Sequence, residues 1–351
     1  MTPALADYTT LGLGGPARSF VSAATEAELI EAVKAADAAA EHVLLIGGGS
    51  NLVISDEGFS GPVIHVNTRG VGYARADDNG AVDVTVAAGE DWDGVVATTV
   101  AEGLAGLESL SGIPGRAGAT PIQNVGAYGR EVAEVIIRVR VYDRRGDQIL
   151  VLGNEDCSFA YRTSLFKSTG ARYVVLDVTF RLARQALSLP VKYAELAAEL
   201  GVALGEGAGV GEVRSAVLKI RSRKGMVLNP GDPDTRSAGS FFTNPIITAA
   251  GFAAVEAAAA ARAAGPVPKY DAGDGLVKVP AAWLIEHAGF AKGYGAPSPA
   301  RVSSKHTLAL VNTGNATTAD LLALAREIVS GVHAAYGVTL TPEPTLIGVT
   351  L

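Results

Sequence analysis

The sequence predicts a protein of mixed helices and strands, built from more than one compact unit. Its 351 residues exceed the usual size of a single domain. In the first half, apolar runs typical of strands alternate with amphipathic helices. Residues 200–235 are rich in Gly, Pro and Asp around one helix, which indicates a boundary between units. The expected fold class is α+β.

Composition excludes several classes of protein. With 48% hydrophobic and 19% charged residues, the chain can bury a large core without disulfides or metals. A net charge of −7 argues against a nucleic-acid partner. The single cysteine, Cys157, excludes a disulfide framework and a multi-cysteine metal site, so we expect no metal. The start lacks a signal peptide and apolar runs end before membrane length, so we expect a cytoplasmic protein without a membrane partner.

The first elements form a helix followed by two short strands. Residues 25–39 place Leu29, Val33 and neighbouring apolar residues on one face, with Thr25 as cap and Glu28 three residues on. Residues 42–55, HVLLIGGGSNLVIS, read as a strand that enters a glycine turn and leaves as a second strand.

The later elements follow the same patterns. We expect strands at 62–66, 83–89, 136–143, 173–182 and 306–312, and helices at 92–106, 213–224, 248–263, 280–289 and 318–337. The only low-complexity tract is the alanine-rich run inside 248–263.

Two glycine-rich segments are candidates for cofactor binding. In residues 47–51, GGGSN, successive backbone N–H groups without side chains are able to wrap a pyrophosphate, although an isolated glycine triplet is more often an ordinary turn. Residues 111–129 carry five glycines together with Gln123, Asn124 and Tyr128. Side-chain amides bond flat heterocycles, so the two segments suggest one large cofactor with phosphates at one end and a ring at the other.

Five motifs, in order, resemble the UDP-N-acetylenolpyruvoylglucosamine reductase (MurB) family. They are GGGSN, GIPGxxGxxPIQNxGAYG, YRTSLFK (161–167), GSFFTNP (239–245) and PEPTLIG (342–348). The resemblance runs nearly end to end. It implies an FAD-dependent enzyme that takes hydride from NADPH and reduces UDP-N-acetylglucosamine enolpyruvate to UDP-N-acetylmuramate for peptidoglycan synthesis.

The resemblance also implies a division of the chain. It gives a two-part FAD-binding unit of the vanillyl-alcohol-oxidase (PCMH) type, at 1–66 and 67–228, with an insertion at about 186–215. A third, α/β domain for substrate follows at 229–337, and a return segment at 338–351 carries Glu343. We expect a monomer.

By the same resemblance, GGGSN meets the FAD pyrophosphate and residues 111–129 hold the flavin and its linker. The implied cofactor-binding residues are Gly47, Gly48, Gly49, Ser50, Asn51, Leu52, Ser111, Gly112, Ile113, Pro114, Gly115, Gly118, Ala119, Gln123, Asn124, Gly126, Ala127 and Tyr128.

Ser240 resembles the proton donor of the family. Hydride addition to the enol ether leaves carbanion character beside the carboxylate, and that carbon is basic enough to take a proton from a nearby serine. Gly239 permits a close approach, and Phe241 and Phe242 are placed to exclude water. Taken alone, Ser240 reads as a serine that caps a turn beside core aromatics.

Arg162 and Glu343 complete the implied catalytic set. Arg162 corresponds to a guanidinium against the substrate carboxylate, where it takes up growing negative charge. Glu343, between Pro342 and Pro344, corresponds to a glutamate that orients water or substrate. The alternatives are a surface ion pair for Arg162 and a solvated loop carboxylate for Glu343.

Polar residues in the second half are matched to the substrate and to NADPH, with Tyr193 as a lid over the substrate. The set is Tyr161, Tyr193, Arg221, Lys224, Asn244, Tyr270 and Lys278. A solvated face is the alternative for the lysines, and simple helix packing for Tyr193. Arg116, which departs from the family pattern, either reaches an FAD phosphate or points to water, and the role of His306 is equally open.

Two other functions remain open at this point. One is a different FAD-dependent oxidoreductase or oxidase on the same scaffold, which would not need the GSFFTNP and YRTSLFK motifs together. The other is a non-catalytic UDP-sugar-binding regulator, which loss of Ser240, Arg162 or Glu343 would favour. All three residues are present.

Overall fold

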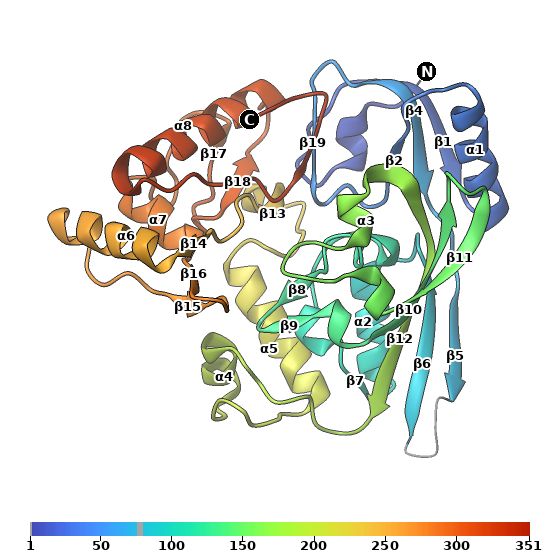
Figure 1. The fold of residues 1–351 in the computed structure, drawn as a ribbon, viewed down its shortest axis with the longest axis horizontal. Helices are drawn as coiled ribbons and strands as arrows, with labels where there is room; N and C mark the ends of the chain where they lie inside the picture. Colours follow the sequence, from blue (N-terminus) through green and yellow to red (C-terminus); the bar gives the residue numbers. More distant parts are fainter. Residues whose placement is uncertain (1, 76–79) are drawn as a thin grey trace. The chain divides into compact units, whose positions relative to one another are not determined.

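The computed structural model describes residues 2–75 and 80–351 (Figure 1). The chain forms two compact units, called unit 1 and unit 2 below. Unit 1 consists mainly of Ala17–Gly49 and Ser60–Arg223, and unit 2 consists of Pro3–Pro16, Ser50–Phe59 and Lys224–Leu351. The three-part division expected from the sequence stays a prediction.

Unit 1 begins with a small sheet covered by a helix. The strands lie in the order β1 (Ala17–Ala23), β4 (Phe59–Val66), β2 (Leu44–Ile46), and helix α1 (Glu26–Ala38) follows β1. The Thr25 hydroxyl accepts the Glu28 N–H while the Glu28 carboxylate accepts the Thr25 N–H, so the predicted capping box is confirmed. Leu29 and Val33 pack against Ile64 of β4.

The rest of unit 1 is an antiparallel sheet with a helical layer. Its strand order is β11 (Gln148–Gly153), β10 (Ile136–Asp143), β12 (Tyr173–Arg184), β6 (Ala81–Ala87), β5 (Val71–Arg75), and β7 (Leu104–Ala105) pairs with β12. Helix α2 (Trp92–Ala101) packs on this sheet, with the Trp92 and Phe180 ring centroids 5.6 Å apart. Helices α4 (Ala194–Leu200) and α5 (Val210–Arg223) share a small core of their own.

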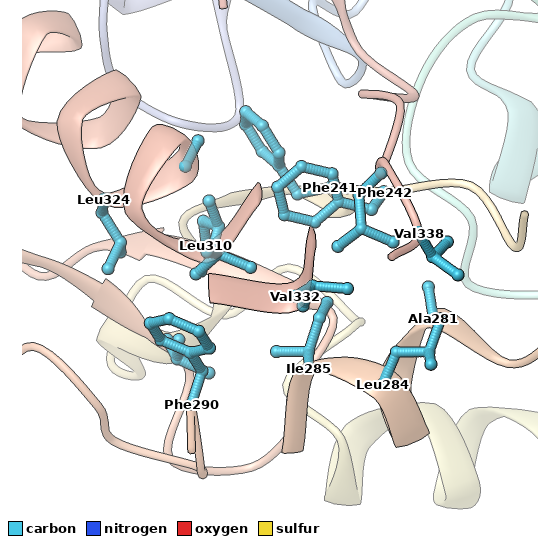
Figure 2. Close-up of a cluster of buried hydrophobic side chains, with 14 of the residues drawn as sticks. Phe241, Phe242, Ala281, Leu284, Ile285, Phe290, Leu310, Leu324, Val332 and Val338 are labelled. Carbon is cyan, nitrogen blue, oxygen red and sulfur yellow. The ribbon is translucent and has the colours of Figure 1, made fainter. Parts of the chain in front are cut away.

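Unit 2 combines two three-stranded sheets with three helices. One sheet has the order β13 (Ser237–Ser240), β18 (Ala309–Asn312), β17 (Ala300–Val302), and the other has β14 (Ile246–Thr248), β16 (Leu276–Lys278), β15 (Tyr270–Asp271). The helices are α6 (Ala249–Ala261), α7 (Ala281–His287) and α8 (Thr318–Tyr336). Figure 2 shows Phe241 and Phe242 in their core beside Ile285 and Val332.

The end of the chain returns to the strand that follows the glycine turn. β19 (Thr345–Ile347) pairs in parallel with β3 (Leu52–Ile54), and the Thr345 N–H donates to the Asn51 carbonyl. Hence the strand–turn–strand reading of residues 42–55 is correct, and the partner of its second strand is the PEPTLIG segment.

No helix in the described ranges combines the length and the hydropathy of a membrane span. The helices and strands together confirm the α+β fold class.

Candidate active site

In unit 1, the glycine turn lies directly against the second glycine-rich segment. A Cβ atom at Gly48 would come within 2.8 Å of the Gly115 Cα, and one at Gly47 within 3.1 Å of the Arg116 Cγ. Distances this short leave no room for a side chain on the turn. The two segments predicted to share one cofactor are therefore neighbours in the structure.

Backbone hydrogen bonds fix the second segment against the strand and helix before it. The Gly115 carbonyl accepts the Trp92 N–H at 3.1 Å, and the N–H of Gly118 donates to the Ala88 carbonyl at 2.9 Å. A Cβ at Gly118 would lie 2.4 Å from the Ala88 Cβ. The cradle is thus rigid and built from backbone, as close approach of a dinucleotide requires.

The side-chain amide of Asn124 forms hydrogen bonds within the protein. Its Nδ2 donates to Glu131 Oε2 at 2.7 Å and to the Ala160 carbonyl at 3.2 Å, and its Oδ1 accepts the Ala133 N–H at 3.2 Å. The side chain is buried and both amide hydrogens are committed. Asn124 therefore shapes the loop, and its place at the flat ring of a cofactor stays a prediction.

Ser111 is likewise turned inward, since its buried hydroxyl donates to the Glu108 carbonyl at 2.7 Å. Asp93, which the sequence analysis missed, holds the same region. Its Oδ1 accepts the Gly112 N–H at 2.6 Å, and its carboxylate takes both terminal nitrogens of Arg214 at 2.6 and 2.9 Å. A carboxylate in the first turn of a helix gave no signal that distinguishes this role from an ordinary helix start.

Arg162 is anchored to the flavin segment. Its Nη2 donates to the Gly126 carbonyl at 2.8 Å, and its guanidinium carbon lies 5.4 Å from the Tyr161 ring centroid. Its backbone is left-handed, with φ of 55°, as are Asn124 at 48° and Tyr128 at 52°. Such backbone costs about 1–3 kcal/mol per non-glycine residue and gathers at functional sites. The structure therefore brings the predicted Arg162 to the predicted cofactor loop.

Three further predicted residues meet in unit 1. The Tyr193 ring stands edge-on to the Tyr128 ring, with centroids 5.5 Å apart. Arg221 on α5 is buried and lies within electrostatic range of Tyr128. Burial raises the pKa of Tyr128 to about 12, so its phenol stays neutral and able to donate a hydrogen bond. Tyr193 itself is 41% exposed, as a side chain that covers a ligand would be.

Ser240 ends strand β13 in unit 2, directly after Gly239 with φ of 75°. Ala309 faces it on β18, and the following Phe241 N–H donates to the Leu308 carbonyl at 2.7 Å. The Ser240 side chain is half-buried, and within the described part of the chain its hydroxyl has no hydrogen-bond partner. A hydroxyl that is held rigidly and makes no hydrogen bond within the described residues is suited to donate a hydrogen bond or a proton to a bound molecule.

The rings of Phe241 and Phe242 are buried in the core of unit 2, with centroids 5.1 Å apart (Figure 2). The expectation that they wall off water around Ser240 is therefore wrong. Their burial fixes the backbone that carries the serine instead.

Glu343 lies beside this strand. Its N–H donates to the Phe241 carbonyl at 2.8 Å, and its own carbonyl accepts the Asn51 Nδ2 at 3.3 Å. Two of the three predicted catalytic residues, Ser240 and Glu343, thus sit on hydrogen-bonded neighbouring segments of unit 2. Arg162 belongs to unit 1, and its place in the same site stays a prediction.

The predicted substrate residues of unit 2 lie on its second sheet. Tyr270 and Lys278 are directly opposite each other on β15 and β16, and directly opposite residues share a face of a sheet. The Asn244 Oδ1 accepts the Ala281 N–H at the start of α7, which fixes the chain just before β14. Lys224 is half-buried at the first position of unit 2 after α5.

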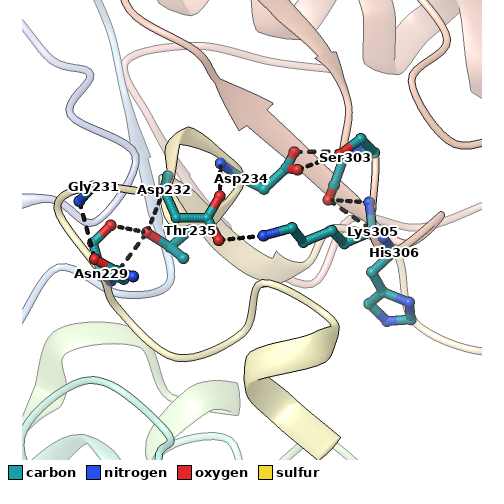
Figure 3. A network of polar contacts seen from close by, with 9 residues as sticks. Asn229, Gly231, Asp232, Asp234, Thr235, Ser303, Lys305 and His306 are labelled. Carbon is teal, nitrogen blue, oxygen red and sulfur yellow. Dashed lines mark hydrogen bonds and ion pairs between the residues drawn. The ribbon is translucent and has the colours of Figure 1, made fainter.

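A polar network fixes the connection between Lys224 and Ser240 (Figure 3). Asp234 accepts hydrogen bonds from the Ser304 N–H and hydroxyl, and Asp232 pairs with Lys305. The His306 N–H donates to the Ser303 hydroxyl at 3.3 Å. The connection is therefore a defined loop tied to the turn before β18.

No group of three or more His, Cys, Asp and Glu side chains in residues 2–75 and 80–351 is arranged to hold a metal. Cys157 donates its thiol to the Gly153 carbonyl at 3.2 Å, and burial raises its pKa to about 12. A neutral, buried thiol is a poor nucleophile, so Cys157 packs in the core as a small apolar residue.

The residues present fit an anionic dinucleotide. At Gly47, Gly48 and Gly118 any Cβ atom would press against the neighbouring segment, so the backbone there carries no side chain. Beside it, the Nε of Arg116 is buried and has no acceptor among the described residues. A backbone without side chains next to an unsatisfied guanidinium nitrogen suits a phosphate-bearing ligand.

Comparison with known proteins identifies the family. The model of an FAD binding domain matches residues 17–151, and that of the UDP-N-acetylenolpyruvoylglucosamine reductase C-terminal domain matches residues 232–347. The UDP-N-acetylenolpyruvoylglucosamine reductase of Thermobifida fusca is 57% identical over 99% of this chain and 97% of its own length. That of Streptomyces coelicolor is 55% identical over 99% and 90%.

The fold agrees with a solved structure. The crystal structure of UDP-N-acetylenolpyruvylglucosamine reductase (MurB) from Thermus caldophilus has a TM-score of 0.65 and 25% identity, and the match covers 99% of this chain and 98% of that one. The FAD-binding fold expected for the first half is thereby confirmed. The chain belongs to the UDP-N-acetylenolpyruvoylglucosamine reductase family.

Proposed function

We propose that this protein reduces UDP-N-acetylglucosamine enolpyruvate to UDP-N-acetylmuramate in peptidoglycan precursor synthesis, with FAD as cofactor and NADPH as electron donor. The observation that carries the proposal is the Ser240 hydroxyl, which has no hydrogen-bond partner among the described residues and stands on a rigid strand next to Glu343.

FAD is held by backbone. Gly47, Gly48 and Gly49 receive the pyrophosphate with Ser50, Asn51 and Leu52, while residues 111–129 bind the flavin. Bound FAD supplies hydride transfer from NADPH to the terminal carbon of the enol ether. Asn124 and Ser111 contribute by shaping their loop, because their side chains are used internally.

Ser240 delivers the proton. Once the terminal carbon has received hydride, the carbon beside the carboxylate carries the negative charge and takes the hydrogen of the Ser240 hydroxyl. The resulting alkoxide regains a proton from solvent, so the serine is unchanged after each turnover. Glu343 orients the water or the substrate for this exchange. Its backbone is held by hydrogen bonds to Phe241 and Asn51.

Arg162 stabilises the developing charge on the substrate carboxylate. Its guanidinium is positioned by the Gly126 carbonyl and the Tyr161 ring, so little reorganisation is needed when charge grows. The UDP-sugar and the NADPH phosphates are bound by the remaining polar set, which is Tyr161, Tyr193, Arg221, Lys224, Asn244, Tyr270 and Lys278. Tyr193 closes over the substrate from its position against Tyr128.

The proposal includes a monomeric protein in the cytoplasm and the domain boundaries 1–66, 67–228, 229–337 and 338–351. Light scattering after size-exclusion chromatography tests the monomer.

One experiment tests the function directly. The purified protein is expected to absorb as a flavoprotein, to bleach on anaerobic addition of NADPH, and to regain its colour on addition of the enolpyruvyl UDP-sugar. A protein that is reoxidised by oxygen and an alcohol-derived product, but not by the UDP-sugar, would be a different flavoenzyme. A protein without flavin that still binds the UDP-sugar would be a non-catalytic binder.

A further inference from the structure

Two arginines and a histidine lie close together beside the glycine turn of unit 1. Arg116 lies over Gly47, with its Cγ 3.1 Å from the place of a Cβ there. His65 is directly opposite Ile46, the last residue of β2 before the turn. Arg69 follows four residues after His65 and lies within electrostatic range of both His65 and Arg116.

The electrostatics of this cluster are unfavourable by themselves. The pKa of His65 is lowered by burial, and further by Arg116 and Arg69. The pKa of Arg116 is lowered by burial, and further by Arg69, while the carboxylates of Asp91 and Glu90 offset part of this effect. Like charges brought together and partly desolvated weaken a fold unless an anion compensates them.

The nearby carboxylates make no direct bond to the Arg116 side chain among the described residues. Glu90 accepts the Gly70 N–H at 2.7 Å and forms an ion pair with Arg69, with its carboxylate 3.5 Å from the Arg69 Nη1. Asp91 accepts the Gly94 N–H at 2.9 Å as the cap of α2. Both are already committed, one to a loop and one to a helix start.

Arg116 makes no side-chain hydrogen bond or ion pair in residues 2–75 and 80–351, and its Nε is buried. An unsatisfied charged donor of this kind is rare in a finished site. Its backbone, in contrast, is held on both sides by the Gly115 carbonyl bond to Trp92 and by the Ala117 N–H donated to Glu90. The rigid loop thus holds the base of the Arg116 side chain against Gly47 of the turn.

We propose that Arg116 donates directly to the diphosphate of the bound dinucleotide, and that Arg69 holds the same anion by longer-range attraction. The inference rests on the proposed function, because it takes the cofactor to be FAD. It decides between the two possibilities that the sequence left open for Arg116. Backbone N–H groups alone are usually enough for a glycine turn to bind a diphosphate. In this chain the planar guanidinium of Arg116 would add further hydrogen-bond donors to them.

The experiment measures cofactor affinity rather than turnover. Apoprotein of the wild type, Arg116→Ser, Arg116→Lys and Arg145→Ser is titrated with FAD and, separately, with riboflavin, which has no phosphate. Flavin fluorescence reports binding, and a thermal melt of each apoprotein reports folding. Arg145→Ser is the matched control, because it removes the same charge from an exposed turn of the same unit.

Arg116→Ser is expected to raise the Kd for FAD about 10- to 100-fold, as loss of a charged hydrogen bond does. The Kd for riboflavin should stay within about twofold, and Arg145→Ser should leave both values unchanged. Arg116→Lys keeps the positive charge but loses the planar pair of N–H donors. Its Kd for FAD should therefore lie between those of Arg116→Ser and the wild type. High salt should reduce the difference in the Kd for FAD between Arg116→Ser and the wild type, because it screens the charge of Arg116.

Three results would overturn the inference. Equal losses for FAD and riboflavin would mean that Arg116 acts on the folding of the loop. A raised KM for NADPH with an unchanged Kd for FAD would assign the cation to the other cofactor. A wild type that binds no FAD would contradict the proposed function, whereas a wild type and an Arg116→Ser variant that bind FAD equally would contradict this inference alone. If the serine variant does not fold, the lysine variant carries the test.

Discussion

The N–H of Glu343 donates a 2.8 Å hydrogen bond to the carbonyl of Phe241. The side chain of Phe241 is fully buried, and the residue before it is Ser240. The hydrophobic core therefore fixes both the proposed proton donor and the proposed catalytic glutamate through one short stretch of backbone. Substitution of Ser240 in this stretch tests catalysis, and substitution of Phe241 tests stability.

Ser240→Ala is expected to leave reduction of the flavin by NADPH nearly intact and to slow its reoxidation by the enolpyruvyl UDP-sugar about 10²- to 10⁴-fold, the usual share of a general acid. Stopped-flow absorbance measures the two half-reactions separately. The reason is that the hydroxyl is needed only after substrate has received hydride. Equal loss in both half-reactions would remove Ser240 from this role.

Phe241→Ala is expected to lower the free energy of unfolding by about 3–5 kcal/mol, because a fully buried ring is replaced by a cavity. Urea titration followed by tryptophan fluorescence measures the change. Leu228→Ala is the control, since Leu228 is 52% exposed and its truncation should cost little. Similar losses for both variants would contradict the core position of Phe241.

Gly48→Ala is expected to abolish or strongly weaken FAD binding, because the added Cβ would lie 2.8 Å from the Gly115 Cα and must push the two cofactor segments apart. Retained flavin per protein after desalting measures the effect. Gly211→Ala, inside α5 with open space around its Cβ, should instead stabilise the protein by about 0.5–1 kcal/mol. Normal flavin content in Gly48→Ala would refute the close contact.

The Asp143 carboxylate predicts an acid-sensitive contribution to stability. Its hydrogen-bonded ion pair with Arg172, at 2.9 and 2.7 Å, lowers the pKa of Asp143 to about 2 from 3.8. A folded-state pKa below the unfolded value stabilises the protein above the unfolded pKa, and this stability is lost as pH falls from about 4 towards 2. Asp143→Asn should be less stable than wild type at pH 7, and the difference should shrink by pH 2. Urea midpoints across this range measure it, and a constant difference would contradict the pair.

Local patterns predicted the parts of the fold that depend on neighbouring residues. The Thr25 capping box, the glycine turn between β2 and β3, and the strands β10 and β12 follow from spacing and periodicity over a few residues. The pairing of β3 with β19 joins residues almost a whole chain apart, and no local pattern encodes it. The inward use of the Asn124 amide also depends on Glu131 and Ala160, which the sequence places in other elements.

In the candidate site, too, some features could be predicted from short motifs, whereas contacts between distant segments could not. Sequence motifs placed Ser240 and Glu343 in one function, and the backbone bond between their segments agrees with it. The sequence did not predict a role for Asp93. Its hydrogen bond to Gly112 and its ion pair with Arg214 are seen only in the folded structure, where α5 packs nearby. The burial of Phe241 and Phe242 reversed their expected role because aromatic residues in a short apolar run fit a core or a cavity wall equally well.

The parallel pair of β3 and β19 has a consequence for how the nascent chain becomes active. Asn51 and Glu343 are 292 positions apart in the sequence, so β3 meets its partner strand only after all the residues between them have been synthesised. Contacts of such long range slow folding. The segment that carries Glu343, the proposed catalytic glutamate, therefore joins β3 long after β3 itself has been synthesised, and any fragment that stops before this segment lacks it.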